Sequence, residues 1–236
     1  MISNMPDQGL ILAVDGPSGT GKSTTCRALA KQLEAKYVDT GAMYRVATLA
    51  VLRAGVDPAD TDAVIAATAD LPLEVSDDPD STQVIFDGED VSRVIREDEV
   101  TRNVSAVSAI PEVRQNLVEL QRKLAAQAHR AIVEGRDIGT VVLADAPAKA
   151  YMTASAEVRA QRRHNQNLAA GIESDFDTVL ADVERRDAAD SSRATSPLRP
   201  AEDAVLVDTS EMTRKEVLDA LIAVVKESAA KEASND

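Results

Sequence analysis

Short apolar runs alternate with amphipathic stretches along this chain. LILAVD at residues 10–15 has the length and composition of a buried strand. Similar runs follow at 36–41 (KYVDTG), 131–135 (AIVEG), 148–155 (AKAYMTAS) and 204–209 (AVLVDT). Between them, as at 23–36 and 113–128, apolar residues recur at the spacing of one helical face. Strands separated by helices are typical of a parallel sheet covered on both faces, so we predict an α/β fold with a five-stranded parallel sheet flanked by helices.

One segment departs from this alternation. Residues 71–92, LPLEVSDDPDSTQVIFDGEDVS, contain two short strand-like runs around an Asp-Pro turn, followed by an FDGED turn. We interpret them as a small antiparallel β element, part of an insert over 65–100. Residues 177–190 have a helical pattern and lead into a Ser- and Pro-containing loop. The sequence shows neither internal repeats nor a low-complexity linker, so we predict a single domain over residues 10–236.

The composition narrows the classes of partner. The chain has 236 residues and a formal net charge of -14, from 26 Lys and Arg against 40 Asp and Glu. Nucleic acids and anionic membrane surfaces bind mainly through clustered basic residues, so we expect this protein to bind neither. A few arginines in one cleft can still attract a small phosphorylated ligand to an acidic protein.

The number of cysteines and the residues at the N-terminus indicate in which cellular compartment the protein is expected. The single cysteine, Cys26, cannot form an internal disulfide, and two histidines offer little for a metal cluster. The N-terminal residues have no basic stretch ahead of their apolar run, and no run approaches the roughly 20 apolar residues of a membrane-spanning helix. We therefore expect a cytoplasmic protein without membrane spans, and we expect it to be a monomer.

The string GPSGTGKS at residues 16–23 fits the phosphate-loop pattern GxxxxGK followed by Ser or Thr. It follows a predicted strand and opens a predicted helix, as that chemistry requires. Glycines let several backbone N–H groups face one anion, and the helix N-terminus adds partial positive charge. Lys22 can reach the outer phosphates of a nucleoside triphosphate, and the Ser23 hydroxyl can bind Mg²⁺. The predicted nucleotide-binding residues are Gly16, Pro17, Ser18, Gly19, Thr20, Gly21, Lys22, Ser23 and Thr24.

A phosphate loop alone leaves the class of nucleotide-binding protein open. The DxxG and NKxD strings that GTPases use are both absent from the sequence. A mechanical ATPase usually has an apolar strand that ends in Asp or Asp-Glu, and the AIVEG run with Glu134 fits that pattern only weakly. A small-molecule kinase needs further cationic groups near the phosphates.

Arginines supply such groups after the ends of the predicted strands. Arg45 follows 36–41, Arg136 follows 131–135, Arg159, Arg162 and Arg163 follow 148–155, and Arg186 and Arg193 flank the loop after the next helix. Ligands of parallel α/β sheets bind at the carboxyl ends of the strands, so we expect these guanidinium groups to converge on the phosphate loop. Transfer of a phosphoryl group between two polyanions needs such fixed cations, whereas hydrolysis needs fewer.

Several longer motifs resemble one family. DTGAMYR (39–45), EGRDIGT (134–140), EVRAQRR (157–163) and RRDAADSSRATSPL (185–198), together with the phosphate loop and the insert, are similar to bacterial cytidylate kinases. The resemblance covers nearly all of residues 10–226. It implies a P-loop kinase fold on which ATP phosphorylates CMP and dCMP by direct in-line transfer. It also implies that the insert at 65–100 covers the acceptor site and that a short helical lid lies at 156–175.

The resemblance assigns roles to individual positions. It implies that Lys22, Arg159, Arg163 and Arg193 are catalytic, with Arg159 and Arg163 on the lid. The implied acceptor residues are Thr40, Tyr44 and Arg45 for the phosphate, Ser105, Arg114 and Asp137 for cytosine, and Arg136, Arg186, Asp190 and Arg193 for sugar and phosphate.

The chemistry of cytosine agrees with the implied triad. Cytosine presents an amino donor beside two acceptors, so a carboxylate such as Asp137 with an Arg or Ser donor suits it. Uracil carries a carbonyl in place of the amino group, which predicts a strong preference for CMP over UMP. Each residue also has a plainer interpretation, since Asp137 could cap a helix and Arg114 could pair with Glu112 or Glu119. The alternatives are another P-loop small-molecule kinase, such as a UMP or AMP kinase, and a nucleotide-binding ATPase without an acceptor.

Overall fold

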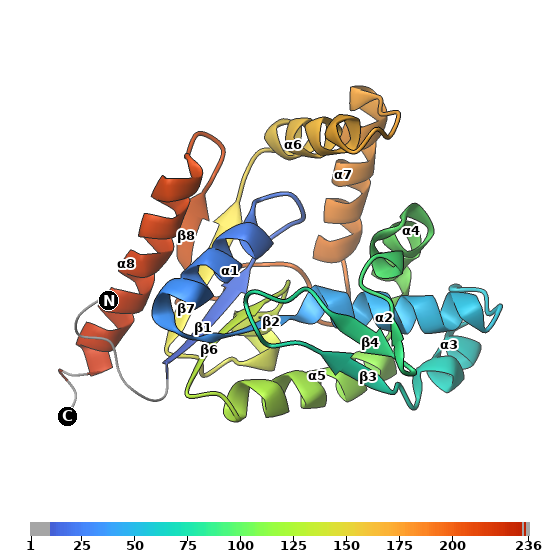
Figure 1. Ribbon diagram of the computed structural model, residues 1–236, viewed down its shortest axis with the longest axis horizontal. Coiled ribbons are helices and arrows are strands. Elements are labelled where there is room, and N and C mark those ends of the chain that lie inside the picture. Colours follow the sequence, from blue (N-terminus) through green and yellow to red (C-terminus); the bar gives the residue numbers. More distant parts are fainter. Residues whose placement is uncertain (1–9, 233, 235–236) are drawn as a thin grey trace.

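A five-stranded parallel sheet forms the centre of the protein. The structure is a computed structural model that describes residues 10–232 and 234. The strands are β1 (Leu10–Asp15), β2 (Lys36–Asp39), β6 (Arg130–Glu134), β7 (Ala148–Thr153) and β8 (Val205–Asp208), in the order β2-β6-β1-β7-β8. Every neighbouring pair runs parallel, and β1 lies in the middle (Figure 1). The predicted fold class is confirmed, and the carboxyl ends of the strands meet along one edge of the sheet.

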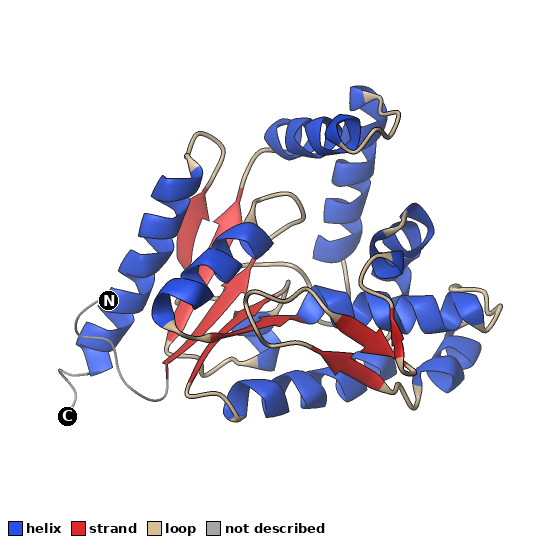
Figure 2. Ribbon diagram, viewed as in Figure 1, coloured by secondary structure: helices blue, strands red, loops and turns tan. Residues whose placement is uncertain are grey.

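Alternation within β1 explains why helices cover both faces of the sheet. Leu10, Leu12 and Val14 belong to one core cluster with residues of α1 (Lys22–Leu33) and α8 (Arg214–Glu232). Ala13 belongs to a second cluster on the opposite face, with residues of α2 (Thr40–Arg53) and α5 (Pro111–Ala126). Successive side chains of a strand point to opposite faces, so an entirely apolar strand needs two apolar layers around it. Figure 2 shows these helices around the strands.

Helix α1 ends three residues earlier than the helical pattern over 23–36 predicts. Glu34 adopts the left-handed conformation at φ 52° and ψ 42°, and the Ala35 N–H donates to the Ala30 carbonyl at 2.8 Å. This is a helix-ending arrangement in which a left-handed residue turns the chain out of the helix. Lys36 then begins β2, so its place in the predicted helix is wrong.

The antiparallel insert has three strands rather than the predicted two. They are β3 (Leu73–Val75), β4 (Val84–Phe86) and β5 (Glu89–Asp90), in the order β3-β4-β5. The FDGED turn is a tight reversal at Asp87 and Gly88, both at positive φ, from which β5 pairs with β4. The sequence pattern missed β5 because two acidic residues carry no apolar alternation.

The small sheet is flanked by short helical elements. They are α3 (Thr61–Thr68), the turn η1 (Val94–Arg96) and α4 (Asp98–Val107). The predicted insert boundaries, 65 and 100, therefore fall inside α3 and α4. Val84, Val91 and Ile95 pack with Val46 and Leu49 of α2 in a third core cluster, so the insert rests on α2.

Two further helices stand apart from the sheet, at the top right of Figure 1. α6 (Ala156–Ala169) and α7 (Phe176–Ser191) pack against each other, and the turn between them contains Gly171 at φ 73°. The segment predicted as a lid, 156–175, corresponds to α6 and this turn. Helix α7 contains the predicted helix at 177–190.

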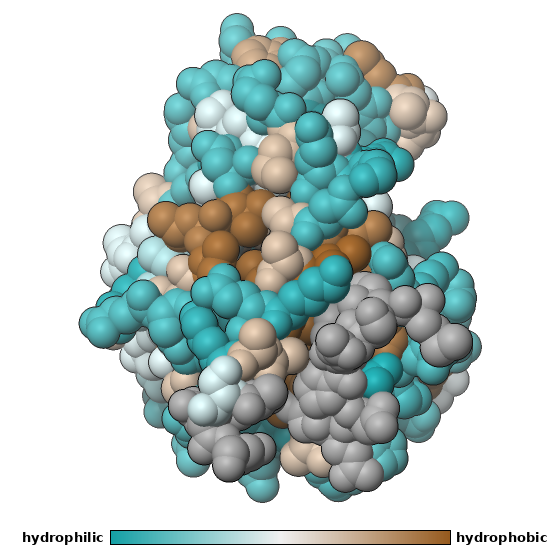
Figure 3. Space-filling view, turned by 90° about the vertical axis from the view of Figure 1, so that its left-hand side faces the viewer, coloured by the Kyte–Doolittle hydropathy of each residue, from teal (hydrophilic) through white to brown (hydrophobic). Residues whose placement is uncertain are grey.

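The surface seen from the side of α8 and β8 is mostly hydrophilic, with one apolar patch near its middle (Figure 3). The edge strand β8 exposes Val205 and Leu206. Within residues 10–232 and 234, no helix combines the length and apolar character that a bilayer crossing needs. The N-terminal residues that showed no targeting pattern lie outside the described residues.

Gly16, between β1 and α1, cannot accept a side chain. Its φ is 142°, and a Cβ atom there would lie 1.9 Å from the Met152 carbonyl oxygen of β7. Gly16→Ala is therefore expected to lower the free energy of unfolding by roughly 3 kcal/mol or more, from backbone strain and overpacking together. Gly88→Ala is the control, because φ is also positive there but the space around it is open. Urea denaturation of both variants measures the difference, and equal losses would contradict the clash.

Candidate active site

A cleft of about 680 Å³ opens at the carboxyl ends of the parallel strands. The phosphate loop, the start of α2, α4, α5 and the end of α7 all contribute to its walls. Eighteen of the predicted site residues line it: Ser18, Gly19, Thr20, Gly21, Lys22, Ser23, Thr24, Thr40, Tyr44, Arg45, Ser105, Arg114, Arg136, Asp137, Arg163, Arg186, Asp190 and Arg193. Gly16, Pro17 and Arg159 are the predicted residues that do not reach this surface.

Lys22 occupies the inside of the phosphate loop. Gly21 precedes α1 in the left-handed conformation, which turns the chain from the loop into the helix. The Lys22 ammonium donates to the carbonyls of Gly16 and Pro17, at 2.7 Å each. Burial, reinforced by the nearby Arg136 charge and opposed by Glu134, lowers the pKa of Lys22 to about 7. A phosphate bound at the loop would place negative charge beside Lys22, raise its pKa and so favour the ammonium form.

Glu134, at the carboxyl end of β6, faces the phosphate loop. The Ser23 hydroxyl donates to Glu134 Oε1 at 2.6 Å, and Oε2 is buried without a hydrogen-bond partner among the described residues. Burial, with the Asp39 charge, raises the pKa of Glu134. Sequence reasoning left Glu134 out of the site, although its position at the end of an apolar strand was the signal that could have identified it.

Asp137 and Arg114 form a buried ion pair that borders the cleft. Arg114 NH2 donates to Asp137 Oδ2, and both side chains are about 5% exposed. Arg114 also donates to the Ser108 carbonyl at 3.0 Å and lies 5.0 Å above the Tyr44 ring. The alternative pairing of Arg114 with Glu112 or Glu119 is therefore not adopted. A buried pair that borders a cleft offers a carboxylate acceptor beside a guanidinium donor.

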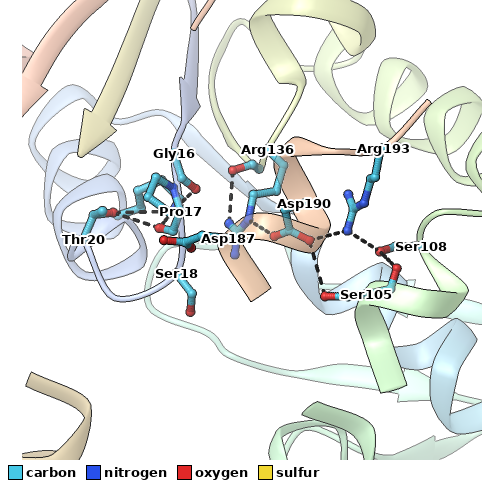
Figure 4. A network of polar contacts seen from close by, with 12 residues as sticks. Gly16, Pro17, Ser18, Thr20, Ser105, Ser108, Arg136, Asp187, Asp190 and Arg193 are labelled. Carbon is cyan, nitrogen blue, oxygen red and sulfur yellow. Dashed lines mark hydrogen bonds and ion pairs between the residues drawn. The ribbon is translucent and has the colours of Figure 1, made fainter. Parts of the chain in front are cut away.

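Asp190 joins three elements in the middle of the cleft wall (Figure 4). Its carboxylate accepts hydrogen bonds from Ser105 Oγ at 3.3 Å, Arg136 Nε at 3.2 Å and Arg193 NH2 at 2.5 Å. Arg193 NH2 also donates to Ser108 Oγ. One buried carboxylate thus orients side chains from α4, the loop after β6 and the loop after α7.

The arginines of the cleft lie close enough to repel one another. Burial, and next the charge of Arg186, lowers the pKa of Arg45 to about 10. Burial and then Arg136 lower the pKa of Arg186, whose Nε is buried without a partner among the described residues. Burial likewise lowers the pKa of Arg193 against the opposing charge of Asp190. The cleft is therefore a concentrated cationic region within an acidic protein.

Arg159 differs from the other predicted arginines because it does not line the main cleft. It donates from Nε to the Ala154 carbonyl at 2.9 Å and from NH1 to the Ser18 carbonyl at 3.2 Å. It also makes a two-point ion pair with Asp187 of α7. Arg159 borders an adjoining hollow of about 620 Å³ beneath α6 and α7, which Arg163 also lines. This hollow merges with the main cleft at several shared residues.

Further cleft residues were absent from the predicted site. Besides Glu134, they include Arg27, Arg96, Thr209 and Arg214. Arg162, which was expected to converge on the phosphate loop with its neighbours, also lines the cleft. Arg27 lies on α1 and stacks over the Tyr37 ring, whereas Arg214 follows the last strand. Arg162 follows β7 and donates to the Thr209 carbonyl at 2.6 Å. The isolated positions of Arg27 and Arg96 in the sequence gave no sign of convergence, whereas the position of Arg162 after a predicted strand did.

A family model described as cytidylate kinase matches residues 12–227. The chain belongs to the cytidylate kinase family. Curated relatives extend the match over almost the full length. The cytidylate kinase of Corynebacterium glutamicum is 70% identical over 95% of this chain and 98% of its own. That of Rhodococcus opacus is 61% identical over 94% and 97%, and that of Mycobacterium avium is 56% identical over 92% and 96%. The resemblance inferred from the motifs is confirmed.

Solved structures support the fold at a greater distance. A gluconokinase from Sinorhizobium meliloti shares 14% identity and a TM-score of 0.52, covering 98% of this chain and 99% of its own. At this identity the likeness shows the fold alone. It agrees with a phosphate-loop kinase fold for this cytidylate kinase family member.

Proposed function

We propose that this protein transfers the γ-phosphoryl group of ATP to the phosphate of CMP and dCMP. The observation that carries the proposal is the buried Arg114–Asp137 pair, which borders the same cleft as the phosphate loop. Membership of the cytidylate kinase family supports it, as do relatives that bear that name.

The acceptor base is expected to lie against the buried pair. The amino group of cytosine would donate to Asp137, while Arg114 and Ser105 would donate to N3 and O2. Tyr44, whose ring packs under Arg114, would form part of the same wall. In UMP a carbonyl would face the Asp137 carboxylate and leave buried polar groups unpaired, so the site disfavours uracil.

The phosphates would occupy the cationic region between the phosphate loop and α7. We expect residues 16–24 to hold ATP, with Lys22 following the γ-phosphoryl group during transfer. Thr40, Arg45, Arg136, Arg186, Asp190 and Arg193 would hold the sugar and phosphate of the acceptor, and Arg163 would approach from α6. The acceptor phosphate is ionised near pH 7, so positioning and charge stabilisation account for catalysis without a general base.

Mg²⁺ fits the oxygen atoms beside the phosphate loop. Magnesium prefers hard oxygen ligands and usually retains several waters. The Ser23 hydroxyl and the Glu134 carboxylate provide such ligands, and Glu134 Oε2 is buried without a hydrogen-bond partner among the described residues. Ser23 would hold the ion directly, and Glu134 would support it. When bound, Mg²⁺ neutralises charge on the ATP phosphates.

Arg159, the segment 156–175 and the insert at 65–100 also have roles in the proposed reaction. We infer that residues 156–175 act as a lid and that the insert covers the acceptor, which together exclude water as a competing acceptor. Arg159 would act in catalysis by leaving Asp187 when the lid closes over the phosphates, because its guanidinium is enclosed in this structure. We further infer that the protein acts in the cytoplasm as a monomer.

An acceptor panel tests the function directly. ADP release is measured with ATP and Mg²⁺ in the presence of CMP, dCMP, UMP, AMP or dTMP. We expect CMP and dCMP to stimulate release strongly and excess EDTA to abolish it. Activity on AMP alone would overturn the base assignment, and ADP release that ignores every acceptor would favour an ATPase.

A further inference from the structure

Asp15, the last residue of β1, is a buried carboxylate next to the phosphate loop that the proposed chemistry does not use. It is 4% exposed and does not line the cleft. Its two oxygens accept hydrogen bonds from a different part of the chain. The Ile138 N–H donates to Oδ1 and the Gly139 N–H donates to Oδ2, at 2.8 Å each.

Those two N–H groups open the short helical turn η2 (Ile138–Val142), which follows Asp137. The first N–H groups of a helical turn have no partner within it and need a cap. Asp, at the position just before the first helical residue, is among the usual caps. Here Asp137 holds that position, yet its side chain makes no capping bond and pairs with Arg114 instead.

The segment around Asp137 is attached to β1 on both sides. Before it, the Gly135 N–H donates to the Val14 carbonyl at 3.0 Å, and after it come the two bonds to Asp15. The backbone at Gly139 packs closely against Lys149 and Asp15. A Cβ atom there would lie 3.2 Å from Lys149 Cδ and 3.4 Å from Asp15 Oδ2. The backbone that carries Asp137 therefore takes its position from the end of β1.

We propose that Asp15 is a positioning residue for base selection: by capping η2 in place of Asp137, it leaves the Asp137 carboxylate free to face Arg114 and the acceptor base. This inference rests on the proposed function. Without Asp15, the nearest carboxylate able to cap η2 is that of Asp137 itself. Capping its own turn would draw Asp137 away from the base and remove the acceptor for the cytosine amino group.

The charges around Asp15 make its ionisation sensitive to pH. Burial raises the pKa of Asp15 to about 6, the nearby charge of Asp137 adds to the rise, and Lys22 opposes it. Tyr151 of β7 lies within range of the Asp15 charge, and Lys149 of β7 packs beside Gly139 as Asp15 does. The carboxylate form accepts from both N–H groups. A protonated carboxyl has one good acceptor oxygen, so below about pH 6 the cap weakens.

Asp15→Asn and Asp15→Ala test the proposal, with Asp60→Asn and Asp60→Ala as matched controls. Asp60 caps α3 by accepting from the Ala63 N–H, and α3 does not border the cleft. The readout is kcat/KM for CMP divided by kcat/KM for UMP. We expect both Asp15 variants to lower this ratio about tenfold with little change in KM for ATP, and the Asp60 variants to preserve it. Asp15 variants that lose thermal stability yet keep the ratio would overturn the proposal.

The wild-type protein supplies a second measurement that does not depend on how the variants fold. Comparison of the same ratio at pH 7.5 and pH 5.5 should show a decrease at the lower pH, through the window set by the pKa of about 6. The phosphates of CMP and UMP titrate alike, so their ionisation cancels in the ratio. An unchanged ratio would count against Asp15. Equal turnover of CMP and UMP by the wild type at pH 7.5 would instead refute the proposed acceptor.

Discussion

Replacing Lys22 by alanine is expected to lower kcat about 10²- to 10³-fold with every acceptor. The ammonium lies inside the phosphate loop, bonded to two loop carbonyls, where it can follow charge as it moves from ATP to the acceptor. Removing a fixed cation from a desolvated site costs transition-state stabilisation that solvent does not replace. The loss should be the same for CMP and dCMP, because these acceptors differ only in the 2′-hydroxyl of the sugar, whereas Lys22 acts on the phosphates.

Lys31→Ala on the same helix is the matched control for Lys22→Ala. Lys31 is half exposed, pairs with Asp80 and does not line the cleft. It should keep wild-type kcat. Because burial already disfavours the charged form of Lys22, its removal should not lower the free energy of unfolding measured in urea. A Lys22→Ala variant that retains wild-type turnover would exclude a role for this ammonium in transfer.

Replacing Asp137 by asparagine is expected to reduce the preference for CMP over UMP about 100-fold or more. The carboxylate is an acceptor only, whereas the amide that replaces it can also donate to the uracil carbonyl. Asparagine is preferable to alanine for this test, because its amide oxygen can still accept a hydrogen bond from Arg114. Both replacements remove the negative charge of the buried pair, at a cost of up to about 3–5 kcal/mol.

The readout for Asp137→Asn is kcat/KM for each acceptor together with KM for ATP. KM for ATP should remain close to wild type, since Asp137 is not one of the predicted ATP-binding residues. Asp208→Asn serves as the control; Asp208 ends β8, is exposed and lies outside the cleft lining. Unchanged discrimination in Asp137→Asn would remove this carboxylate from base recognition.

Strand and helix patterns were sufficient to predict the parallel sheet. All five strands were predicted because each contains a short apolar run, and the central strands β1 and β6 are buried on both faces. Features without apolar periodicity were missed. β5 consists of Glu89 and Asp90, and η2 lies in a segment whose turn is capped by Asp15, more than 120 residues earlier in the sequence. A hydrogen bond between residues so far apart in the sequence leaves no pattern in the residues around either one.

The site residues that belong to sequence motifs were predictable. Those whose orientation depends on contacts with distant side chains were less so. Most of the phosphate loop and all of the arginines beyond the strands except Arg159 do line one cleft. The sequence could not indicate that Arg159 is enclosed by Asp187 and the Ser18 carbonyl, or that Glu134 faces Ser23. Whether a charged side chain points into a cleft or pairs within the protein depends on three-dimensional neighbours that spacing along the chain does not encode.

The mutual repulsion among Arg45, Arg186 and Arg136 has a consequence for the lifetime of the protein in a cell. The folded chain without nucleotide holds these like charges together, and anionic substrates relieve that repulsion when they bind. A ligand that binds only the folded state stabilises it by mass action. Binding of cellular nucleotides in this cleft would therefore stabilise the folded state. Starvation for nucleotides would enlarge the fraction of molecules that open and become accessible to proteases.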